Sequence, residues 1–260
     1  MGVTEKWGLV IPAGGLVRDP LATALGTPRK ALAMIGGKSC VERTLDAARD
    51  AGFDRIAVVS GEDVREVIGD DCFVEERGGQ IANAAAGVEA LADCEWILFM
   101  PADTPFLHAE AISHFVQSVE AQLGDAEANW FAAGLCPYSA FLEVLPGFEH
   151  PHIKLTDGDY MSGAFYATSR EGFLNCAKKF EGFSHNRKSQ FRMLMQIGIV
   201  PMVKYLFHRM SLAEGKAVLG RFFGGSAIVV TDCDPWSMAD IDTVDEYQRL
   251  VSEADPGKKV

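Results

Sequence analysis

The chain has 260 residues, 48% of them hydrophobic, and a formal net charge of -12 at pH 7. This length and apolar fraction are enough for one large domain with a sizeable core. An acidic chain without a strongly basic tract is poorly suited to nucleic acid or to anionic membranes, because both require clustered lysine and arginine. We therefore expect no nucleic acid and no membrane as partners. A small anionic ligand in a local basic pocket remains compatible with this charge.

The opening residues MGVTEKWGLV contain no apolar signal core, so a cytoplasmic protein is expected. The apolar run over residues 193–207 is too short to span a bilayer and contains Pro201 and Lys204, so we interpret it as buried helices. The six cysteines form no CxxC pair, which favours free thiols in a reducing compartment.

The first half of the chain alternates strand and helix patterns. Strands are predicted over residues 7–13, 55–60 and 96–103, and helices over residues 40–52, 81–92 and 110–123. Short, unbroken apolar strands between helices are typical of a parallel sheet covered on both faces, with right-handed crossovers.

The second half is less regular. Strands are predicted over residues 129–135, 160–169 and 226–231, and helices over residues 170–180, 186–198, 211–220 and 243–254. We find no repeat, no low-complexity linker and no domain break, and the last residues, DPGKKV, are expected to be a frayed tail. The whole pattern indicates a single domain, either a monomer or a homodimer.

The segment LVIPAGGLVRDP (residues 9–20) leaves the first predicted strand at Pro12 and places Gly14 beside Gly15. Glycine N–H groups at the carboxyl end of a strand can face phosphate oxygens without a side chain in the way. A P-loop requires GxxxxGK[ST], which is absent. A dinucleotide-binding loop requires GxGxxG at the start of a helix, and the adjacent glycines and Pro20 do not allow this.

More of the chain supports a third interpretation. The motif A-G-x-x-x-R is followed by elements close to P-K-x-L and G-K and by a helix that ends in glycine; the matching residues are Ala13, Gly14, Arg18, Pro28, Lys30, Leu32, Gly37 and Lys38. This order resembles the nucleotidyltransferases with a GT-A-like Rossmann fold, of the molybdenum-cofactor guanylyl/cytidylyltransferase (MobA-like) type, which are related to sugar-phosphate nucleotidyltransferases. The resemblance is good over residues 7–105 and weak over residues 224–247. Arg29 is interposed in the second element, which leaves open whether it or Lys30 contacts the triphosphate.

The resemblance implies a three-layer α/β/α sandwich with a mostly parallel mixed sheet, the GT-A-like nucleotide-diphospho-sugar transferase fold. It implies an enzyme that transfers NMP from an NTP to a phosphorylated small-molecule acceptor with release of pyrophosphate. Ala13, Gly14 and Gly15 are then expected to bind the nucleotide. Arg18 and Lys30 are the expected catalytic cations, because the triphosphate charge must be neutralised and aligned.

The base pocket is expected at Gly79 and Asn83, in the segment ERGGQIANAAAGVEAL. Gly79 would let a base approach the backbone, and Asn83 can both donate to and accept from a base or ribose edge. The alternative is an ordinary helix N-terminus with Asn83 in solvent. The resemblance also implies a nucleotide-binding half over residues 1–125 and an acceptor-binding half over residues 126–260.

Two carboxylate motifs predict a Mg²⁺ site. Asp103 follows an apolar strand in the family pattern D-x-P, and the late stretch SMADIDTVDEYQRL supplies Asp242, with Asp240 in reserve. Carboxylates at the carboxyl ends of strands, together with substrate phosphates, suit Mg²⁺. The alternative for each motif is a helix cap: Asp103 with Pro105 near N1, and Asp242 or Thr243 before the last helix.

The acceptor site is expected around Gly163, in the strand GDYMSGAFYATS, and at Arg187 and Lys188 in a local basic cluster. A solvated helix face is the alternative for the cluster. His150 and His152 are interpreted as polar groups of a loop, because two histidines without a third ligand rarely form a metal site.

Two other functions remain as alternatives. A GT-A-like glycosyltransferase that uses a nucleotide sugar usually carries D-x-D at the strand end, where this chain has only ADTP. A non-catalytic nucleotide-binding regulatory module would not need Arg18, Lys30 and Asp103 together. The glycine spacing disfavours an NAD-dependent dehydrogenase.

Overall fold

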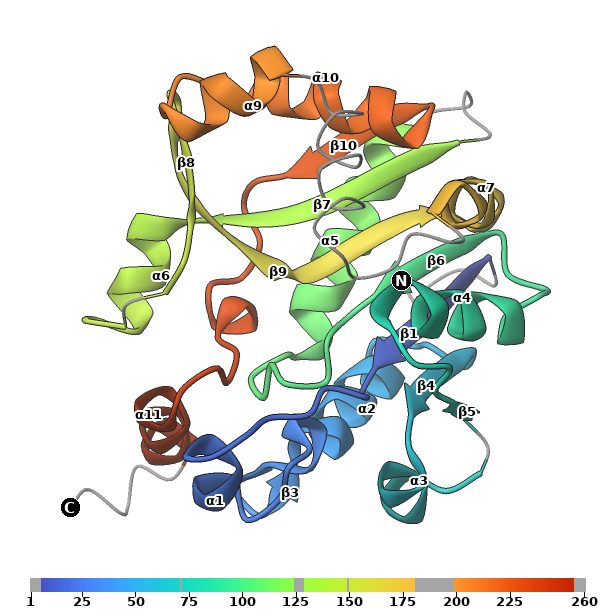
Figure 1. The fold of residues 1–260 in the computed structure, drawn as a ribbon, viewed down its shortest axis with the longest axis vertical. Coiled ribbons are helices and arrows are strands. Elements are labelled where there is room, and N and C mark those ends of the chain that lie inside the picture. The colour runs from blue at the N-terminus through green and yellow to red at the C-terminus, as the bar shows by residue number, and fades with distance from the viewer. Residues whose placement is uncertain (1–5, 71, 124–128, 149, 181–198, 255–260) are drawn as a thin grey trace.

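The computed structural model describes residues 6–70, 72–123, 129–148, 150–180 and 199–254, and an eight-stranded mixed sheet forms the centre of this part of the chain (Figure 1). The strand order is β10-β7-β9-β6-β1-β4-β5, with β8 paired to β9. The strands are β1 (Trp7–Pro12), β4 (Ile56–Ser60), β5 (Phe73–Glu75), β6 (Trp96–Phe99), β7 (Trp130–Pro137), β8 (Ile153–Leu155), β9 (Gly158–Ser169) and β10 (Ser226–Val230).

Most neighbouring strands are parallel. β1 pairs in parallel with both β4 and β6, β4 pairs in parallel with β5, and β10 pairs in parallel with β7, whereas β9 is antiparallel to β6, β7 and β8. A separate antiparallel ladder joins β2 (Met34–Ile35) and β3 (Lys38–Ser39). Because β1 and β6 are parallel neighbours, the segments that follow Pro12 and Phe99 leave the same edge of the sheet.

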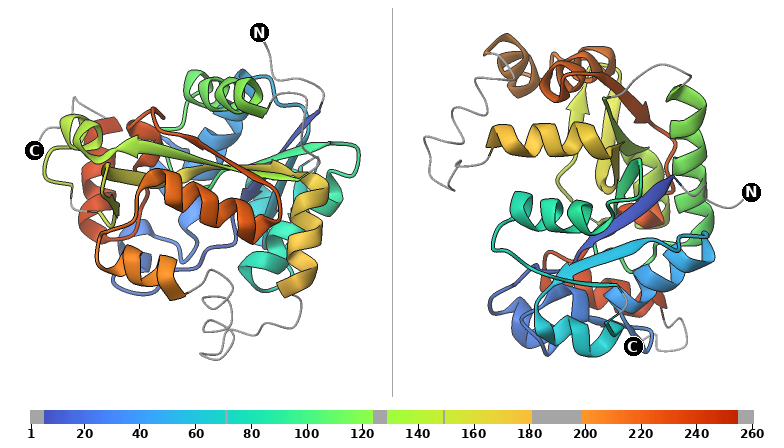
Figure 2. Two further views of the ribbon diagram at one scale, coloured as in Figure 1. Left: turned by 90° about the horizontal axis from the view of Figure 1, so that it is seen from above. Right: turned by 90° about the vertical axis from the view of Figure 1, so that its right-hand side faces the viewer.

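Helices cover both faces of the sheet (Figure 2). On one face lie α4 (Gln80–Ala90), α7 (Arg170–Phe180) and α10 (Leu212–Phe223), and on the other lie α2 (Cys40–Asp50) and α5 (Ala109–Leu123). The remaining helices are α1 (Leu21–Leu25), α3 (Glu62–Ile68), α6 (Tyr138–Val144), α9 (Ile199–Leu206) and α11 (Val244–Ala254), with short 3-10 turns η1 (Lys30–Leu32) and η2 (Trp236–Met238). The expected three-layer, single-domain architecture with a mostly parallel mixed sheet is therefore confirmed.

Local sequence explains why the helices that flank the site begin where they do. At the start of α2, the Ser39 hydroxyl accepts from the backbone N–H of Glu42, and the Glu42 carboxylate accepts from the N–H of Ser39. α4 lies close to β1 because Gly87 has no side chain: a Cβ there would be 2.6 Å from Val10 Cγ1. This contact brings the N-terminal end of α4 towards the segment that follows β1.

The segment between β10 and α11 crosses the molecule. β10 is the edge strand at one end of the sheet. α11 lies far from β10, on the side of the molecule where it packs against α1 and β2 (Figure 1). The connection therefore carries residues of the C-terminal part, including Asp240 and Asp242, past the carboxyl ends of the central strands. This path decides the composition of the candidate site.

Of the buried helices predicted over residues 193–207, the described part does contain a helix, α9 (Ile199–Leu206), but the predicted burial is wrong, because Val200, Leu206 and Phe207 are 64–70% exposed. Among the described elements, α9 packs mainly against α10. The predicted helix over residues 186–198 and the predicted frayed tail lie outside the described residues. Among the described residues, no helix is long and apolar enough to cross a membrane.

Candidate active site

The glycine loop, defined here as residues 13–18, connects β1 to α1. It forms a short antiparallel pairing with the chain before η1: Val17 N–H donates to the Pro28 carbonyl at 2.7 Å, and Lys30 N–H donates to the Gly15 carbonyl at 3.2 Å. Within the described residues, the N–H groups of Gly14 and Gly15 donate to no protein acceptor. The loop therefore presents free amide donors at the carboxyl end of β1.

The buried side chain of Arg29 fixes the glycine loop by a hydrogen bond to its backbone. Its side chain is 8% exposed, and its Nη1 donates to the Gly14 carbonyl at 2.9 Å. Its Nε donates to Asp63 Oδ2 at 2.8 Å, and Glu76 Oε1 lies 3.4 Å from Nη1. The sequence left open which of two neighbouring cations faces a ligand. The structure commits Arg29 to protein partners and directs Lys30 to a different group of carboxylates.

Asn83 and the glycines before α4 lie next to the glycine loop. Asn83 Oδ1 accepts from the Arg77 N–H at 2.7 Å, which fixes the turn that leads into α4. A Cβ on Gly14 would overlap the Glu76 carboxylate and would lie 3.5 Å from Asn83 Nδ2, so the Asn83 amide is adjacent to the loop. Gly79 caps α4 with a φ of 122°, a conformation that favours glycine.

Arg18 lies at the end of the glycine loop and is exposed. Its side chain makes no hydrogen bond or ion pair with the described residues. It is thus free to reach a ligand, but no contact ties it to the carboxylates described next. Ala13, by contrast, is buried at 1% exposure, and its N–H donates to the Val59 carbonyl at 2.8 Å, which anchors the first residue of the loop to the sheet.

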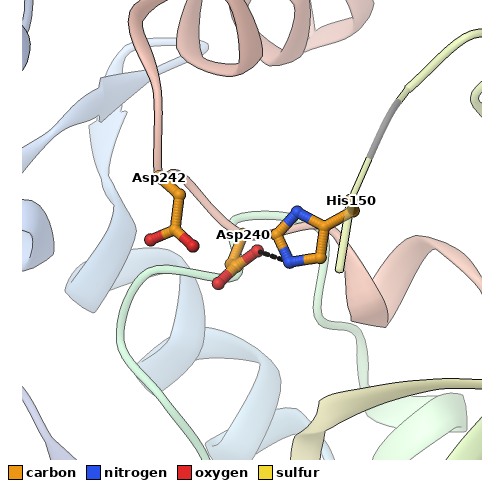
Figure 3. A group of neighbouring side chains, drawn as sticks. All are labelled: His150, Asp240 and Asp242. Carbon is orange, nitrogen blue, oxygen red and sulfur yellow. Dashed lines mark ion pairs between the residues drawn. The ribbon is translucent and has the colours of Figure 1, made fainter. Parts of the chain in front are cut away.

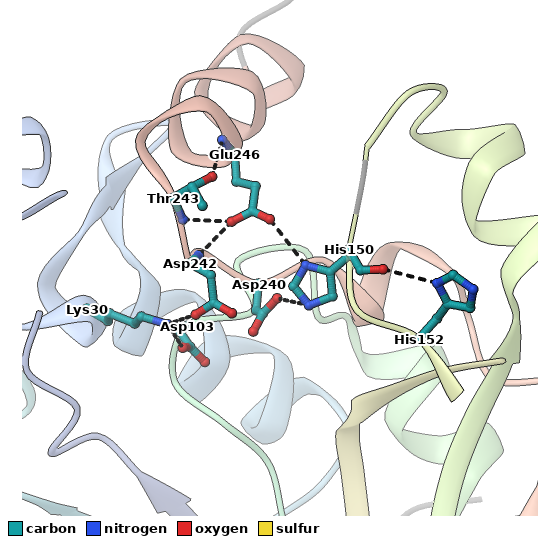
Figure 4. Close-up of polar contacts among 8 residues, drawn as sticks. All are labelled: Lys30, Asp103, His150, His152, Asp240, Asp242, Thr243 and Glu246. Carbon is teal, nitrogen blue, oxygen red and sulfur yellow. Dashed lines mark hydrogen bonds and ion pairs between the residues drawn. The ribbon is translucent and has the colours of Figure 1, made fainter. Parts of the chain in front are cut away.

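Lys30 joins carboxylates from distant parts of the chain (Figure 4). Its Nζ lies 3.2 Å from Asp103 Oδ2 and is also paired with Asp242 Oδ1. Because Lys30 N–H also contacts the Gly15 carbonyl, one residue links the glycine loop to both carboxylates. The helix-cap alternative for Asp103 is wrong, since the helix that follows, α5, begins only at Ala109.

A second cluster of polar side chains, which contains His150, lies next to the carboxylates that contact Lys30. The ligand atoms of His150, Asp240 and Asp242 all lie within 4.8 Å of one another (Figure 3). His150 Nε2 is 3.1 Å from Asp240 Oδ1, and His150 Nδ1 is 3.2 Å from Glu246 Oε1. The interpretation of His150 as only a polar loop group is therefore incomplete. Its partner Glu246 is 96 positions away in the chain, so no sequence spacing could have revealed the pairing.

The electrostatics of this region reflect crowded carboxylates. Burial raises the pKa of the Asp240 carboxyl to about 6, with His150 opposing the rise and the Asp103 and Asp242 carboxylates adding to it. Burial alone would lower the pKa of Lys30, but Asp103 and Asp242 outweigh it, and the pKa lies above its ordinary value. The region thus concentrates negative charge that a cation stabilises.

The start of α11 holds Asp242 in place. Glu246 Oε2 accepts from the N–H groups of Asp242 at 2.9 Å and Thr243 at 2.7 Å, while Glu246 N–H donates to Thr243 Oγ1 at 3.2 Å. Thr243 is therefore the helix cap, and the Asp242 side chain remains available to Lys30. The capping alternative for this motif holds for Thr243 and is compatible with a ligand role for Asp242.

Residues 9–142, more than half of the chain, match the family model described as the MobA-like NTP transferase domain. The chain belongs to the MobA-like NTP transferase family. It is accordingly a nucleotidyltransferase that uses an NTP, and the resemblance seen in the sequence is confirmed. No curated protein matches the chain by sequence.

Solved structures share the fold of this MobA-like NTP transferase. A hypothetical transferase from Thermus thermophilus is 24% identical with a TM-score of 0.74, covering 93% of this chain and 99% of its own. A 4-diphosphocytidyl-2C-methyl-D-erythritol synthase from Anaerococcus prevotii is 17% identical with a TM-score of 0.56, covering 95% of each chain. A CMP:2-keto-3-deoxy-manno-octonic acid synthetase complexed with CTP is 15% identical with a TM-score of 0.57, covering 97% and 100%.

The expected acceptor residues of this MobA-like NTP transferase are less well connected to the site. Gly163 has a φ of +135° and lies in β9, where the register with β7 shifts between Ala133 and Leu135. No hydrogen bond or ion pair among the described residues links Gly163 to the carboxylates. Arg187 and Lys188 lie outside the described residues.

Proposed function

We propose that this enzyme transfers an NMP group from an NTP to a phosphorylated small-molecule acceptor in a Mg²⁺-dependent reaction that releases pyrophosphate. The observation that carries the proposal is Lys30, which contacts the glycine loop through its backbone and both Asp103 and Asp242 through its ammonium group. Free amide donors and clustered carboxylates at one edge of the sheet suit a polyanion and a divalent cation.

The carboxylate set fits Mg²⁺. Asp240 Oδ1 is buried and accepts no hydrogen bond from the described residues, although His150 Nε2 lies 3.1 Å away, and a bound cation would stabilise this oxygen. Asp103 and Asp242 would hold the ion, with Asp240 as the further ligand. Bound Mg²⁺ supplies charge neutralisation for the triphosphate and an orientation for the α-phosphate.

The protein groups supply the rest of the chemistry. The N–H groups of Gly14 and Gly15 bind β- and γ-phosphate oxygens, and Arg18 and Lys30 offset the triphosphate charge. An acceptor phosphate oxygen attacks the α-phosphorus, the bond from that phosphorus to the β-phosphate bridging oxygen breaks, and pyrophosphate leaves with the electron pair. A phosphate monoester is already ionised near neutral pH, since its second pKa is about 6. No protein base is therefore required.

The two halves of the chain bind different substrates. Residues 1–125 bind the nucleotide, with Gly79 and Asn83 at the base and ribose, and residues 126–260 bind the acceptor, with Gly163 in β9 and the basic residues Arg187 and Lys188. The adjacency of Asn83 and Gly14 supports the first assignment. The acceptor half contributes Asp242 to the carboxylates, so the acceptor would approach the α-phosphate from that side.

A pyrophosphate-release assay tests the proposal. ATP, GTP, CTP and UTP are each incubated with Mg²⁺ and a panel of phosphorylated sugars and cofactors, and nucleotide sugars are tested as donors for the glycosyltransferase alternative. With the productive pair, Asp103→Asn should lower kcat/KM by about 100-fold or more. The matched control Asp46→Asn removes an exposed carboxylate whose ion-pair partner among the described residues is Lys38, and it should leave the rate unchanged. Full activity in Asp103→Asn would overturn the proposal.

A further inference from the structure

We propose that His150, Asp240 and Asp242 form a mixed nitrogen–oxygen site for a divalent cation, in which His150 Nε2 is a direct ligand. The site shares Asp242 and Asp240 with the proposed Mg²⁺ site, and to that extent the inference rests on the proposed function. It goes further in assigning a histidine ligand, which changes the class of metal ion that the enzyme binds best.

The spacing of the three ligand atoms suits one ion. Donors that lie about 2.1 Å from a shared ion are separated from one another by about 3.0–4.2 Å, depending on the coordination geometry. The ligand atoms of His150, Asp240 and Asp242 lie within 4.8 Å of one another, and the closest pair, His150 Nε2 and Asp240 Oδ1, is 3.1 Å apart. Small side-chain adjustments therefore suffice to complete the site.

The contact between His150 and Asp240 supports this interpretation independently. Although 3.1 Å is a hydrogen-bond distance, Asp240 Oδ1 is buried and accepts no hydrogen bond from the described residues. A cation held by both atoms would satisfy the buried oxygen and is compatible with their short separation. A buried carboxylate oxygen without a donor is otherwise expensive.

The other ring nitrogen of His150 is already held. Nδ1 lies 3.2 Å from Glu246 Oε1, and the Glu246 carboxylate, 11% exposed, is fixed by the N–H groups of Asp242 and Thr243. A metal-binding histidine usually donates its second N–H to a carboxylate, which fixes the tautomer and directs the free nitrogen at the ion. Figure 4 shows this chain of contacts from Thr243 through Glu246 to the imidazole.

Asp242 can serve both neighbours. Lys30 pairs with Oδ1 of Asp242, and no described donor contacts Oδ2. Figure 4 places the Asp242 carboxylate between Lys30 and Asp240. An imidazole nitrogen with carboxylate oxygens suits Mn²⁺, Co²⁺ or Zn²⁺ better than Mg²⁺, which prefers oxygen ligands alone.

The test uses Mn²⁺ alone with the nucleotide-free, full-length protein. Electron spin echo envelope modulation of bound Mn²⁺ should show a directly coordinated ¹⁴N nucleus, and ¹⁵N-histidine labelling should replace that signal with a ¹⁵N pattern without any mutation. His150→Gln should abolish the signal and weaken Mn²⁺ binding by about 10-fold or more. The control His152→Gln, two positions away, should retain both the signal and the affinity.

The proposal is overturned if Mn²⁺ does not bind, if bound Mn²⁺ shows no nitrogen signal, or if the signal persists in His150→Gln. These outcomes are separable from the proposed function. Pyrophosphate release with Mg²⁺ but without a nitrogen signal removes the histidine ligand and keeps the nucleotidyl transfer proposal. A nitrogen signal that depends on His150, in a protein that releases no pyrophosphate with any acceptor, supports the site and counts against that proposal.

Discussion

The ammonium group of Lys30 is paired with the carboxylate of Asp242, a residue 212 positions later in the chain. The same ammonium lies 3.2 Å from Asp103 Oδ2. Lys30 belongs to the turn that follows the glycine loop, whereas Asp242 precedes the last helix. This relationship closes the candidate site, and it means that Lys30 holds its positive charge where the proposed divalent cation would also find its ligands.

Replacement of Lys30 by methionine should therefore have opposite effects on metal binding and on turnover. Lys30→Met removes a cation that competes for Asp103 and Asp242, so Mn²⁺ affinity of the nucleotide-free protein should rise by about 3- to 10-fold. Pyrophosphate release should fall by about 100-fold, because a charge that stabilises the triphosphate is lost. Calorimetric titration with Mn²⁺ and the release assay measure the two effects. Lys38→Met, which changes an exposed lysine, is the control; an unchanged Mn²⁺ affinity in Lys30→Met would contradict the competition.

Arg29 should prove to be a structural residue that lysine cannot replace. A lysine cannot reproduce the fork that reaches the Gly14 carbonyl, Asp63 and Glu76, so some of these acceptors would lose the donor that the buried guanidinium provides. We expect Arg29→Lys to lower the free energy of unfolding by about 1–3 kcal/mol. Urea unfolding measures this change. Arg65→Lys, at an exposed ion pair, should stay within about 0.5 kcal/mol, and equal effects at the two sites would refute the structural role of Arg29.

Replacement of two helical glycines by alanine should change the free energy of unfolding in opposite directions. In Gly87→Ala the new Cβ would meet Val10 and Val59 within 3.0 Å, so α4 would be pushed from β1, at a cost of about 1–3 kcal/mol. In Gly215→Ala the nearest atom is Met210 Sδ at 3.7 Å, and alanine should stabilise α10 by about 0.5–1 kcal/mol. Guanidinium unfolding of both variants tests the packing of α4. A neutral or stabilising Gly87→Ala would show that α4 is not held against β1.

The cysteines should be inert in the folded protein. Burial raises the pKa of the Cys40 and Cys233 thiols to about 12 and that of Cys136 to about 11, and all six cysteines are buried and form no disulfide. A raised thiol pKa means that less of the reactive thiolate is present at about pH 8. Intact-mass analysis after iodoacetamide treatment should show almost no labelling in native protein and six labels in guanidinium. Rapid native labelling of Cys40, Cys136 or Cys233 would contradict their burial.

Local patterns in the sequence were enough to predict the main strands and helices, and the order of short motifs was enough to predict the family. The burial of an unbroken apolar strand or an amphipathic helix can be predicted from its own residues, because the hydrophobic pattern repeats over neighbouring positions in the sequence. The glycine loop and Asp103 could be placed at one edge of the sheet for the same reason. Parallel neighbouring strands present their carboxyl ends together.

Local patterns failed where a side chain depends on a distant partner. Arg29 and Lys30 are adjacent in the chain, yet one is buried against Asp63 and Glu76 and the other faces Asp103 and Asp242. The apolar residues of α9 resemble a core helix, but only packing against α10 decides that most of them meet solvent.

The sequence by itself thus determined the layered α/β fold, the glycine loop at the carboxyl end of the first strand and the first carboxylate of the site. Only the tertiary structure decided that Lys30 is the cation paired with Asp103 and that His150 lies beside Asp240 and Asp242. These contacts form between segments that are brought together by the path from β10 to α11. Side-chain pairing across such separations depends on the packing of the whole chain, and no local spacing encodes it.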